Sequence, residues 1–369
     1  MKLTILSFDS WDVIRSRKHH LAENLAKSNY FSEVIYVAPP NNKKCINSYN
    51  HNKLKIHTPI IKSIKSNSPL DKYPFTKDMS NILTLDISHK IGEEETILWL
   101  QSPAYAHLLN KLKDKIKIKL IIGDYTDDYS KLIPELSNYF LQGQKIIGDN
   151  SNLILSVSEK ITDKLKETYP YKRIINLPNA VDESFLNKKS EIPLELSQIN
   201  SPRVGYVGRI VGRLDKDLIK TLIERFPKYN FVFIGESYED ISWMKKYQNF
   251  KFLGPKDYTS LPNYIDNLDV CILPHKINDL TDSNDPVKLY DYLSRGKPVV
   301  TTNIEGVNKF SELIYISSTY EGFGNDIIKS LNEKNLKIHY ARINVMKNHT
   351  WQKRTEVLLK NIRGMLNDK

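Results

Sequence analysis

The chain has 369 residues, 40% of them hydrophobic and 26% charged, a balance that excludes a disordered or collagen-like protein. Its two cysteines, Cys45 and Cys271, are too few for a disulfide framework or a four-ligand zinc site, which favours a reducing, cytoplasmic compartment. Basic residues outnumber acidic ones by 54 to 43, so the net charge is +11. This charge favours anionic partners without choosing among nucleic acid, lipid head groups and phosphorylated small molecules.

In the first half of the chain, short β-rich runs alternate with amphipathic segments of helical length. We expect helices over 19–27 and from Tyr105 onward, and strands at 3–7, 34–37, 97–100, 118–122, 153–157 and 174–177. Residues 41–95 have the weakest pattern, and long loops are expected there. No apolar run approaches the ~18 residues of a membrane span, and the start of the chain lacks the length of a secretory signal.

A polar segment at 186–201 interrupts this alternation and is interpreted as an interdomain linker. The alternation then resumes with strands at 204–207, 231–234, 270–273 and 299–301, and helices at 217–225, 287–294 and 323–331. The sequence predicts two doubly wound α/β domains, over 1–185 and 202–351, that face a cleft. Such sheets bind ligands at the carboxyl ends of their strands.

The most informative segment runs from Leu273 to Thr301 and places Pro286 near the start of a helix. Lys288 and Asp291 are three residues apart, so they share one face of that helix. Together with the helix N-terminus, Lys288 would suit a diphosphate, and Asp291 would suit ribose hydroxyls. The alternative is a solvated ion pair on the helix surface.

A second segment, VGYVGRIVGRLD, follows the first strand of the second half and contains Gly208, Arg209 and Arg213. Glycines let a backbone approach a phosphate, and arginines bind it through forked charged hydrogen bonds. The glycine pattern is weak because it is not the dinucleotide-binding fingerprint. An ordinary turn with surface arginines explains it equally well.

A third segment, GDYTDDY, places Asp124, Asp127 and Asp128 directly after a strand. A carboxylate in this position could act as a general base toward an acceptor hydroxyl. The alternative is that Asp124 or Asp127 caps the helix beginning near Tyr129.

Two basic segments lie elsewhere in the first half. The turn FDSWDVIRSRKHH would either bind an acceptor or a phosphate, or form a basic, solvated helix start. Lys111–Lys119 alternates lysine with apolar residues, which fits either an anionic membrane surface or an exposed helix end. The histidines show no metal-binding spacing, and no strip of interleaved aromatic and basic residues indicates nucleic-acid binding.

Taken in order, these segments resemble a GT-B glycosyltransferase over nearly the whole chain. They are most similar to family 4-like enzymes, including the group with teichuronic acid and other bacterial exopolysaccharide transferases. The resemblance rests on SWDVIRSRKHHLAENLA, GDYTDDY, LPNAVDESF, VGYVGRIVGRLD, DPVKLYDYLSRGKPVV and NHTWQKR. It implies a last helix, at about 352–369, that crosses back to the first domain.

The resemblance also implies transfer of a sugar from a UDP- or GDP-linked donor to a saccharide or lipid-linked acceptor in bacterial surface polysaccharide synthesis. Asp127 would be the base, with Asp128 and Asp124 behind it, and no metal or cofactor is needed. The implied donor-site residues are Gly208, Arg209, Arg213, Gly254, Lys256, Ser283, Pro286, Lys288 and Asp291. Ser283 departs from the family's E-x7-E motif, whose second acid falls at Asp291. The implied acceptor-side residues are Ser10, Trp11 and Arg17.

Three other functions fit parts of the sequence. A non-catalytic protein that binds a nucleotide-sugar and supports another transferase would explain the missing acid at Ser283. An epimerase of the same fold would need further acid and base groups, and none stands out. A nucleic-acid binder fits the charge alone. We expect a cytoplasmic location, with a peripheral contact at the inner face of the membrane as an open alternative.

Overall fold

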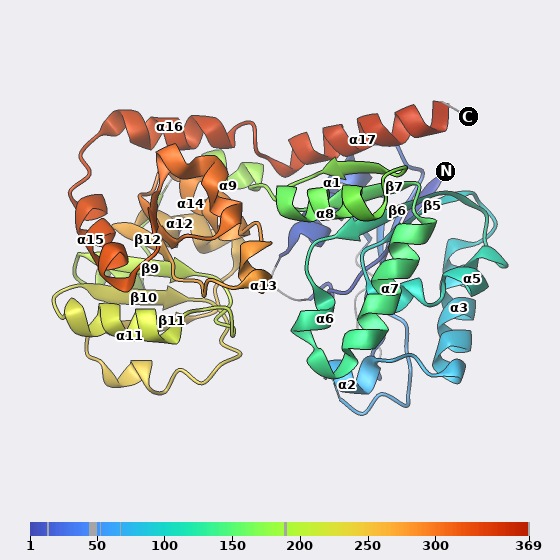
Figure 1. The fold of residues 1–369 in the computed structure, drawn as a ribbon, viewed down its shortest axis with the longest axis horizontal. Coiled ribbons are helices and arrows are strands. Elements are labelled where there is room, and N and C mark those ends of the chain that lie inside the picture. The colour runs from blue at the N-terminus through green and yellow to red at the C-terminus, as the bar shows by residue number, and fades with distance from the viewer. Residues whose placement is uncertain (13–14, 44–49, 52, 67, 188–189, 368–369) are drawn as a thin grey trace. The chain divides into compact units, whose positions relative to one another are not determined.

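The computed structural model describes residues 1–12, 15–43, 50–51, 53–66, 68–187 and 190–367 (Figure 1). Cys45 and two residues of the expected linker, 188–189, lie outside the described residues. The chain forms two compact units. Unit 1 comprises Met1–Pro178 with Thr355–Lys369, and unit 2 comprises Asn179–Arg354.

Unit 1 is built on an eight-stranded sheet in the order β3-β4-β2-β1-β5-β6-β7-β8, in which only β3 runs antiparallel to its neighbour. Its strands are β1 (Lys2–Leu6), β2 (Val34–Val37), β3 (Asn50–His51), β4 (Leu54–His57), β5 (Thr96–Leu100), β6 (Ile118–Tyr125), β7 (Leu153–Ser156) and β8 (Arg173–Asn176). Its helices are α1 (Arg17–Lys27), α2 (Pro69–Lys72), α3 (Lys77–Ile91), α4 (Pro103–Ala106), α5 (Leu109–Lys113), α6 (Tyr129–Leu132), the 3-10 turn η1 (Pro134–Leu136), α7 (Ser137–Asn150) and α8 (Glu159–Thr168).

Unit 2 is built on a six-stranded parallel sheet in the order β11-β10-β9-β12-β13-β14. Its strands are β9 (Arg203–Val207), β10 (Asn230–Ile234), β11 (Phe250–Gly254), β12 (Val270–Leu273), β13 (Val299–Thr302) and β14 (Tyr315–Ser317). Its helices are α9 (Glu183–Asn187), α10 (Leu194–Ser197), α11 (Lys216–Arg225), α12 (Leu261–Asp266), α13 (Asp279–Asp282), α14 (Val287–Ser294), α15 (Tyr320–Leu331) and α16 (Leu336–Met346), with 3-10 turns η2 (Met244–Lys246), η3 (Tyr258–Ser260) and η4 (Glu305–Leu313).

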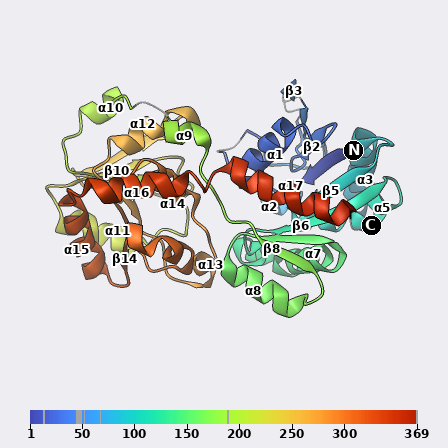
Figure 2. The same cartoon turned by 90° about the horizontal axis from the view of Figure 1, so that it is seen from above.

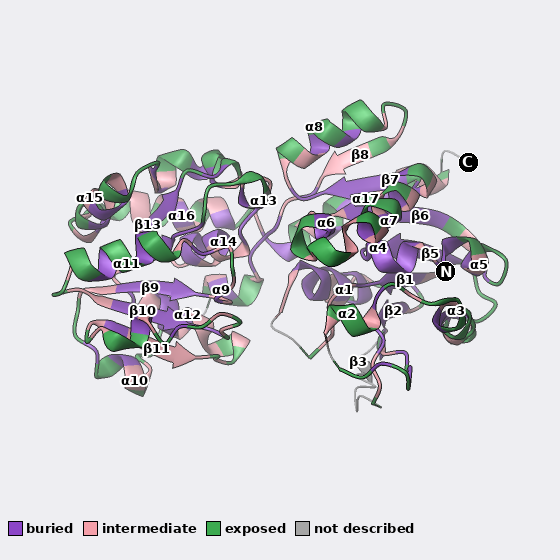
Figure 3. Cartoon of the chain, turned by 60° about the horizontal axis from the view of Figure 1, so that its bottom comes forward, coloured by how far each residue is buried: buried purple, intermediate pink, exposed green. Residues whose placement is uncertain are grey.

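The central strands of both sheets are buried apolar runs, as parallel strands covered by helices require. β5 (TILWL) and β12 (VCIL) are buried at every position, whereas helices such as α11 bury one face (Figure 3). The predicted two α/β units with parallel sheets are therefore confirmed.

The last helix, α17 (Trp351–Asn367), begins in unit 2, and its residues from Thr355 onward belong to unit 1 (Figure 2). In unit 1 the Arg363 guanidinium lies 5.0 Å from the Tyr30 ring, and Arg173 donates to Asn361 at 3.0 Å. The returning helix that the resemblance implied is thus present. No helix in the described part of the chain has the length and apolarity needed to cross a bilayer.

The expectation of long loops over 41–95 was wrong. This region contains β4 and the 15-residue helix α3, which the Thr76 side chain caps by accepting from the Met79 amide. The helix buries apolar residues four apart, at Met79, Leu83, Ile87 and Ile91, on unit 1. That spacing was present in the sequence, but the polar residues around it obscured the helical pattern.

The segment at 186–201, expected to be a linker, lies within unit 2 and contains the short helix α10. Leu196 of this helix is fully buried in the core of unit 2. The chain passes between the units at Pro178–Asn179 and again at Arg354–Thr355.

Candidate functional site

In unit 2, Lys288 lies against Gly208, so the two segments that the sequence singled out meet. Lys288 is in the first turn of α14, after Pro286 at the N-cap. Its side chain is half-buried, with the ammonium 5.4 Å from the centre of the Tyr206 ring. Gly208 has φ of +148°, and a Cβ there would lie 1.7 Å from Lys288 Cε. A glycine is therefore needed both for the backbone conformation and for the passage of the lysine.

Two arginines surround this lysine. Burial, together with the nearby Arg213 and Arg209 charges and against the opposing effect of Asp291, lowers the pKa of Lys288 to about 7. The Arg209 Nε atom is buried without a hydrogen-bond partner. Among the described residues, none of these three cations forms a side-chain hydrogen bond or ion pair. Like charges gathered without an ion-pair partner make a site suited to an anion.

His275, which the sequence analysis did not single out, lies beside this cationic group. It follows β12, is 1% exposed, and neither ring nitrogen has a hydrogen-bond partner. Burial, together with the Lys288 and Arg213 charges, lowers its pKa well below the ordinary value. His275 is therefore neutral at physiological pH and adds no charge to the group.

Asp291 is one turn along α14 from Lys288, as the spacing predicted, but the two form no ion pair in the described structure. Burial raises the pKa of Asp291 to about 8; Lys288 opposes this shift and Asp182 adds to it. Its Oδ1 atom is buried without a partner. The side chains are thus partly buried, and the alternative of a solvated surface pair does not describe them.

The remaining predicted donor-site residues are less clearly placed for a ligand. Ser283 donates its hydroxyl to the Asp279 carbonyl at 3.3 Å. Gly254 ends β11 with φ of +67° and has open space where a Cβ would stand. Lys256, two residues on, forms an ion pair with Glu195 at 2.8 Å. Their roles in donor binding stay predictions.

Asp285, which the sequence analysis also missed, anchors the start of α14. Its carboxylate is buried and accepts from the Asn179 amide at 2.6 Å, from the Lys309 ammonium at 2.6 Å and from the Tyr290 hydroxyl at 2.9 Å. Arg354 donates to the Asn179 carbonyl at 3.2 Å. These bonds fix the segment that presents Lys288. The adjoining polar residues in the sequence gave no signal that this aspartate would be buried.

In unit 1, the three aspartates of GDYTDDY have different surroundings. Asp124 is buried within β6, where burial raises its pKa against the effect of Arg17, whose guanidinium lies 3.5 Å away. Asp128 precedes α6 but makes no side-chain cap; it accepts from the Ser130 hydroxyl at 2.5 Å and lies 3.8 Å from Lys131. Asp127 is half-buried beside them. The residue at the N-cap of α6 is Asp128, so the alternative in which Asp124 or Asp127 caps this helix was wrong.

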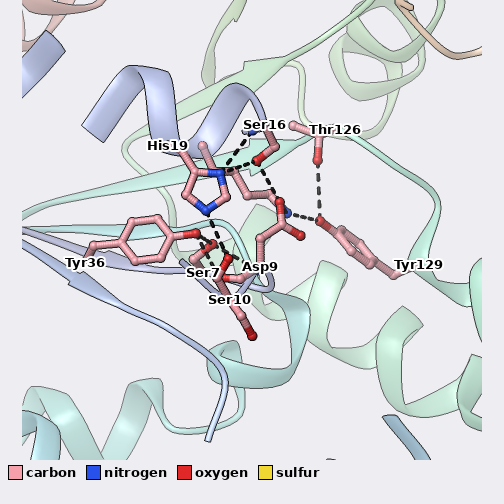
Figure 4. Close-up of polar contacts among 9 residues, drawn as sticks. Ser7, Asp9, Ser10, Ser16, His19, Tyr36, Thr126 and Tyr129 are labelled. Carbon is pink, nitrogen blue, oxygen red and sulfur yellow. Dashed lines mark hydrogen bonds and ion pairs between the residues drawn. The ribbon is translucent and has the colours of Figure 1, made fainter. Parts of the chain in front are cut away.

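The first turn of α1 differs from the solvated helix start that was one of two alternatives. Arg17, Lys18, His19 and His20 are all at most 5% exposed. Arg17 donates to the Leu177 carbonyl at 2.6 Å. His19 accepts at Nδ1 from the Ser16 amide and donates from Nε2 to the Ser10 carbonyl, both at 3.0 Å (Figure 4). Burial lowers the pKa of His19 to about 4, against the opposing Asp9 charge.

Trp11, predicted on the acceptor side, is half-buried and packs edge-on against the His19 and Tyr36 rings, each 4.9 Å away between centroids. Ser10 contributes its carbonyl to His19. Ser10, Trp11 and Arg17 thus lie at one end of unit 1, and their acceptor-side role stays a prediction. No group of three or more metal-ligating side chains occurs among the described residues.

Comparisons with known proteins agree with this geometry. Residues 201–332 match the family described as "Glycosyl transferases group 1". The chain is 25% identical to the putative teichuronic acid biosynthesis glycosyltransferase TuaH of Bacillus subtilis (strain 168), over 84% of this chain and 82% of that protein. It is 22% identical to an uncharacterized 42.6 kDa protein in the cps region of Klebsiella pneumoniae, over 80% of this chain and 82% of that protein.

Solved structures match the complete fold. Sucrose-phosphate synthase from Thermosynechococcus elongatus superimposes with a TM-score of 0.73 at 14% identity over 100% of both chains. An Escherichia coli trehalose-6-phosphate structure bound with UDP-2-fluoro glucose superimposes with a TM-score of 0.71 at 11% identity over 98% of both chains. The chain has the GT-B fold, and the resemblance to glycosyltransferases of this fold, including teichuronic acid enzymes, that its sequence indicated is confirmed.

Proposed function

We propose that this protein transfers a glycosyl group from a nucleoside-diphosphate sugar to a saccharide or lipid-linked acceptor in surface polysaccharide synthesis. The observation that carries the proposal is the group formed by Arg209, Arg213 and Lys288 in unit 2. These cations form no ion pair in the described structure; Lys288 lies in the first turn of α14, and the charges of Arg209 and Arg213 act on it. A diphosphate supplies the two negative charges that such a group favours.

The same group would assist the reaction. As an acceptor oxygen forms its bond to the anomeric carbon, the bond from that carbon to the diphosphate oxygen breaks. The leaving nucleoside diphosphate keeps the electron pair and gains one negative charge, which Lys288 and the two arginines would stabilise. The acceptor hydroxyl also loses its proton, and Asp127 is the proposed group that receives it.

Two tests separate donor binding from catalysis. Lys288→Ala should weaken binding of UDP- or GDP-linked sugars about tenfold or more, because a charged contact to phosphate is lost. Lys220→Ala, which removes an exposed lysine on α11 of the same unit, is the matched control. Titration calorimetry measures both variants. Equal affinities for Lys288→Ala and wild type would contradict the proposed donor site.

Incubation with radiolabelled UDP- and GDP-sugars tests turnover. Transfer or hydrolysis supports a transferase, an isomeric sugar nucleotide would indicate an epimerase, and binding without turnover would indicate a non-catalytic partner. Asp127→Asn should abolish transfer while leaving donor affinity within about twofold of wild type, because Asp127 belongs to unit 1 and the donor cations to unit 2. A fully active Asp127→Asn variant would exclude Asp127 as the base.

We also propose a peripheral contact with anionic lipid through Lys111–Lys119. Lys113, Lys115, Lys117 and Lys119 of this segment are exposed. Lys115→Gln with Lys117→Gln should weaken binding to anionic vesicles, whereas the matched pair Lys164→Gln with Lys166→Gln on α8 should not. Binding should also fall as salt is added. Equal binding to neutral and anionic vesicles would contradict this contact.

A further inference from the structure

Two loops of unit 1 are joined by a buried charged side chain. The first loop follows β1 and contains Asp9; the second follows β6 and contains Thr126 and Asp127. The strand order places β5 between β1 and β6, so both loops leave the same edge of the parallel sheet. Ligands of such sheets bind at this edge.

Lys18 makes the connection between them. Its ammonium donates to the Tyr129 hydroxyl at 2.8 Å and lies 3.5 Å from Asp9 Oδ2, which also accepts from the Ser16 hydroxyl at 2.8 Å. The aromatic rings of Phe8 and Tyr129 lie 5.8 and 5.5 Å from the ammonium. Lys18 therefore contacts the ends of both loops at once.

Burial of the Lys18 ammonium is unfavourable in free energy unless Asp9 and Tyr129 contact it. Lys18 is 5% exposed, and transferring an ammonium from water into a protein interior is unfavourable without compensating charge and hydrogen bonds. Burial alone would lower the pKa of Lys18, but Asp9 and Tyr129 raise it above the ordinary value. The lysine therefore stays charged, and its bond to Tyr129 is a charge-assisted one.

Tyr129 transmits this bond to the loop that carries Asp127. It is the first residue of α6, its ring packs 4.7 Å from Phe8 between centroids, and its hydroxyl lies 3.4 Å from the Thr126 hydroxyl. The backbone from Thr126 to Tyr129 is thus tied at both ends through one hydroxyl group. Asp127 lies between those ends.

We propose that Lys18 is a positioning residue: acting through Tyr129, it fixes the turn at 126–129 and so sets the place of the Asp127 carboxylate. The inference rests on the proposed function, in which Asp127 receives the acceptor proton. A carboxylate that must meet a hydroxyl within hydrogen-bond distance loses efficiency when its loop moves by about 1 Å.

The test uses two variants, because Lys18→Met leaves Asp9 without its cation and risks misfolding. Tyr129→Phe keeps the ring, the Asp9–Lys18 pair and the packing, and removes only the hydroxyl. Lys27→Met, an exposed lysine in the last turn of the same helix α1, is the matched control. Each protein is assayed for kcat, for donor affinity by calorimetry, and for hydrogen exchange of the peptide spanning 126–132.

Tyr129→Phe and Lys18→Met should each lower kcat about 10- to 100-fold, as expected for loss of a hydrogen bond to a charged group. Donor affinity should stay within about twofold of wild type. The double variant, Lys18→Met with Tyr129→Phe, should have a kcat no lower than that of the slower single variant, since both substitutions remove the same contact. In both variants, amide hydrogen exchange should become faster at Lys131 and Leu132, whose amides donate to the Asp128 carbonyl at 3.0 and 3.2 Å. Lys27→Met should behave as wild type.

Unchanged kcat and unchanged exchange in Tyr129→Phe would overturn the positioning role of Lys18. Equal losses in Lys27→Met would do the same, because they would show a general effect of substitutions in α1. A wild-type protein that turns over no nucleotide-sugar would overturn the proposed function itself, and the exchange measurement, which needs no turnover, distinguishes the two failures.

Discussion

Protonation of Lys288 gives donor binding a pH dependence that follows directly from the site. Burial and two neighbouring arginines lower the pKa of Lys288 to about 7, so the unliganded protein loses this charge as pH rises through neutrality. A bound diphosphate brings two negative charges and raises that pKa again. At a pH between the pKa of Lys288 in the free protein and its higher pKa in the complex, Lys288 takes up one proton when the donor binds.

The size of the effect can be worked from that pKa. With a free pKa of about 7, the protonated fraction of Lys288 falls from about nine-tenths at about pH 6 to about one-tenth at about pH 8. Donor affinity should therefore fall about tenfold over this interval, and binding at about pH 8 should take up close to one proton. The diphosphate of a nucleotide-sugar is a diester and does not titrate in this range, so it adds no slope of its own.

Calorimetry in buffers of different ionisation enthalpy measures the proton uptake directly. In Lys288→Arg the guanidinium remains charged, so both the slope and the uptake at Lys288 should disappear. Asp291, with a pKa raised to about 8, also titrates in this range, and Asp291→Asn removes its contribution while keeping Lys288. A wild-type affinity that is flat with pH, or an equal slope in Lys288→Arg, would show that Lys288 does not take up the proton when the donor binds.

Three further substitutions test the surroundings of this group. Gly208→Ala places a Cβ against the Lys288 side chain and forces alanine to adopt a φ of +148°. Donor affinity should fall about tenfold or more in calorimetry, and the unfolding free energy in urea should fall by about 1–3 kcal/mol. An unchanged donor affinity would contradict the contact between Gly208 and Lys288. Arg213→Gln removes a charge that lowers the Lys288 pKa, so proton uptake at about pH 8 should decrease, and an increase would be contrary to this account. Asp285→Ala leaves the buried Tyr290 hydroxyl and the Asn179 amide without their acceptor and should lower the unfolding free energy in urea by about 2–5 kcal/mol, whereas a loss below about 1 kcal/mol would show that the anchor is dispensable.

Much of the fold could be predicted from the sequence because its strands are short buried apolar runs with clear boundaries. The helix at 287–294 was predicted with the bounds that the structure shows. Helix α3 was missed although its apolar residues recur every four positions, because polar residues surround them. The strands β11 and β14 were missed because both lie at the edges of the sheet and are only partly buried.

The candidate site was predictable only in part. Spacing placed Lys288 and Asp291 on one helical face, but their meeting with Gly208 and Arg213 depends on the order of strands β9 and β12 in the sheet, which local patterns do not encode. The burial of Lys18 and His19 could not be foreseen, because charged and polar residues at a helix start are ordinarily solvated. Asp285 was missed for the same reason.

A crystal structure of the protein with bound UDP or GDP tests the account most directly. We predict that the diphosphate will lie within hydrogen-bond distance, about 3 Å, of Lys288 Nζ and of the guanidinium of Arg209 or Arg213. A nucleotide bound elsewhere on the chain, with these three side chains making no contact with phosphate, would contradict it.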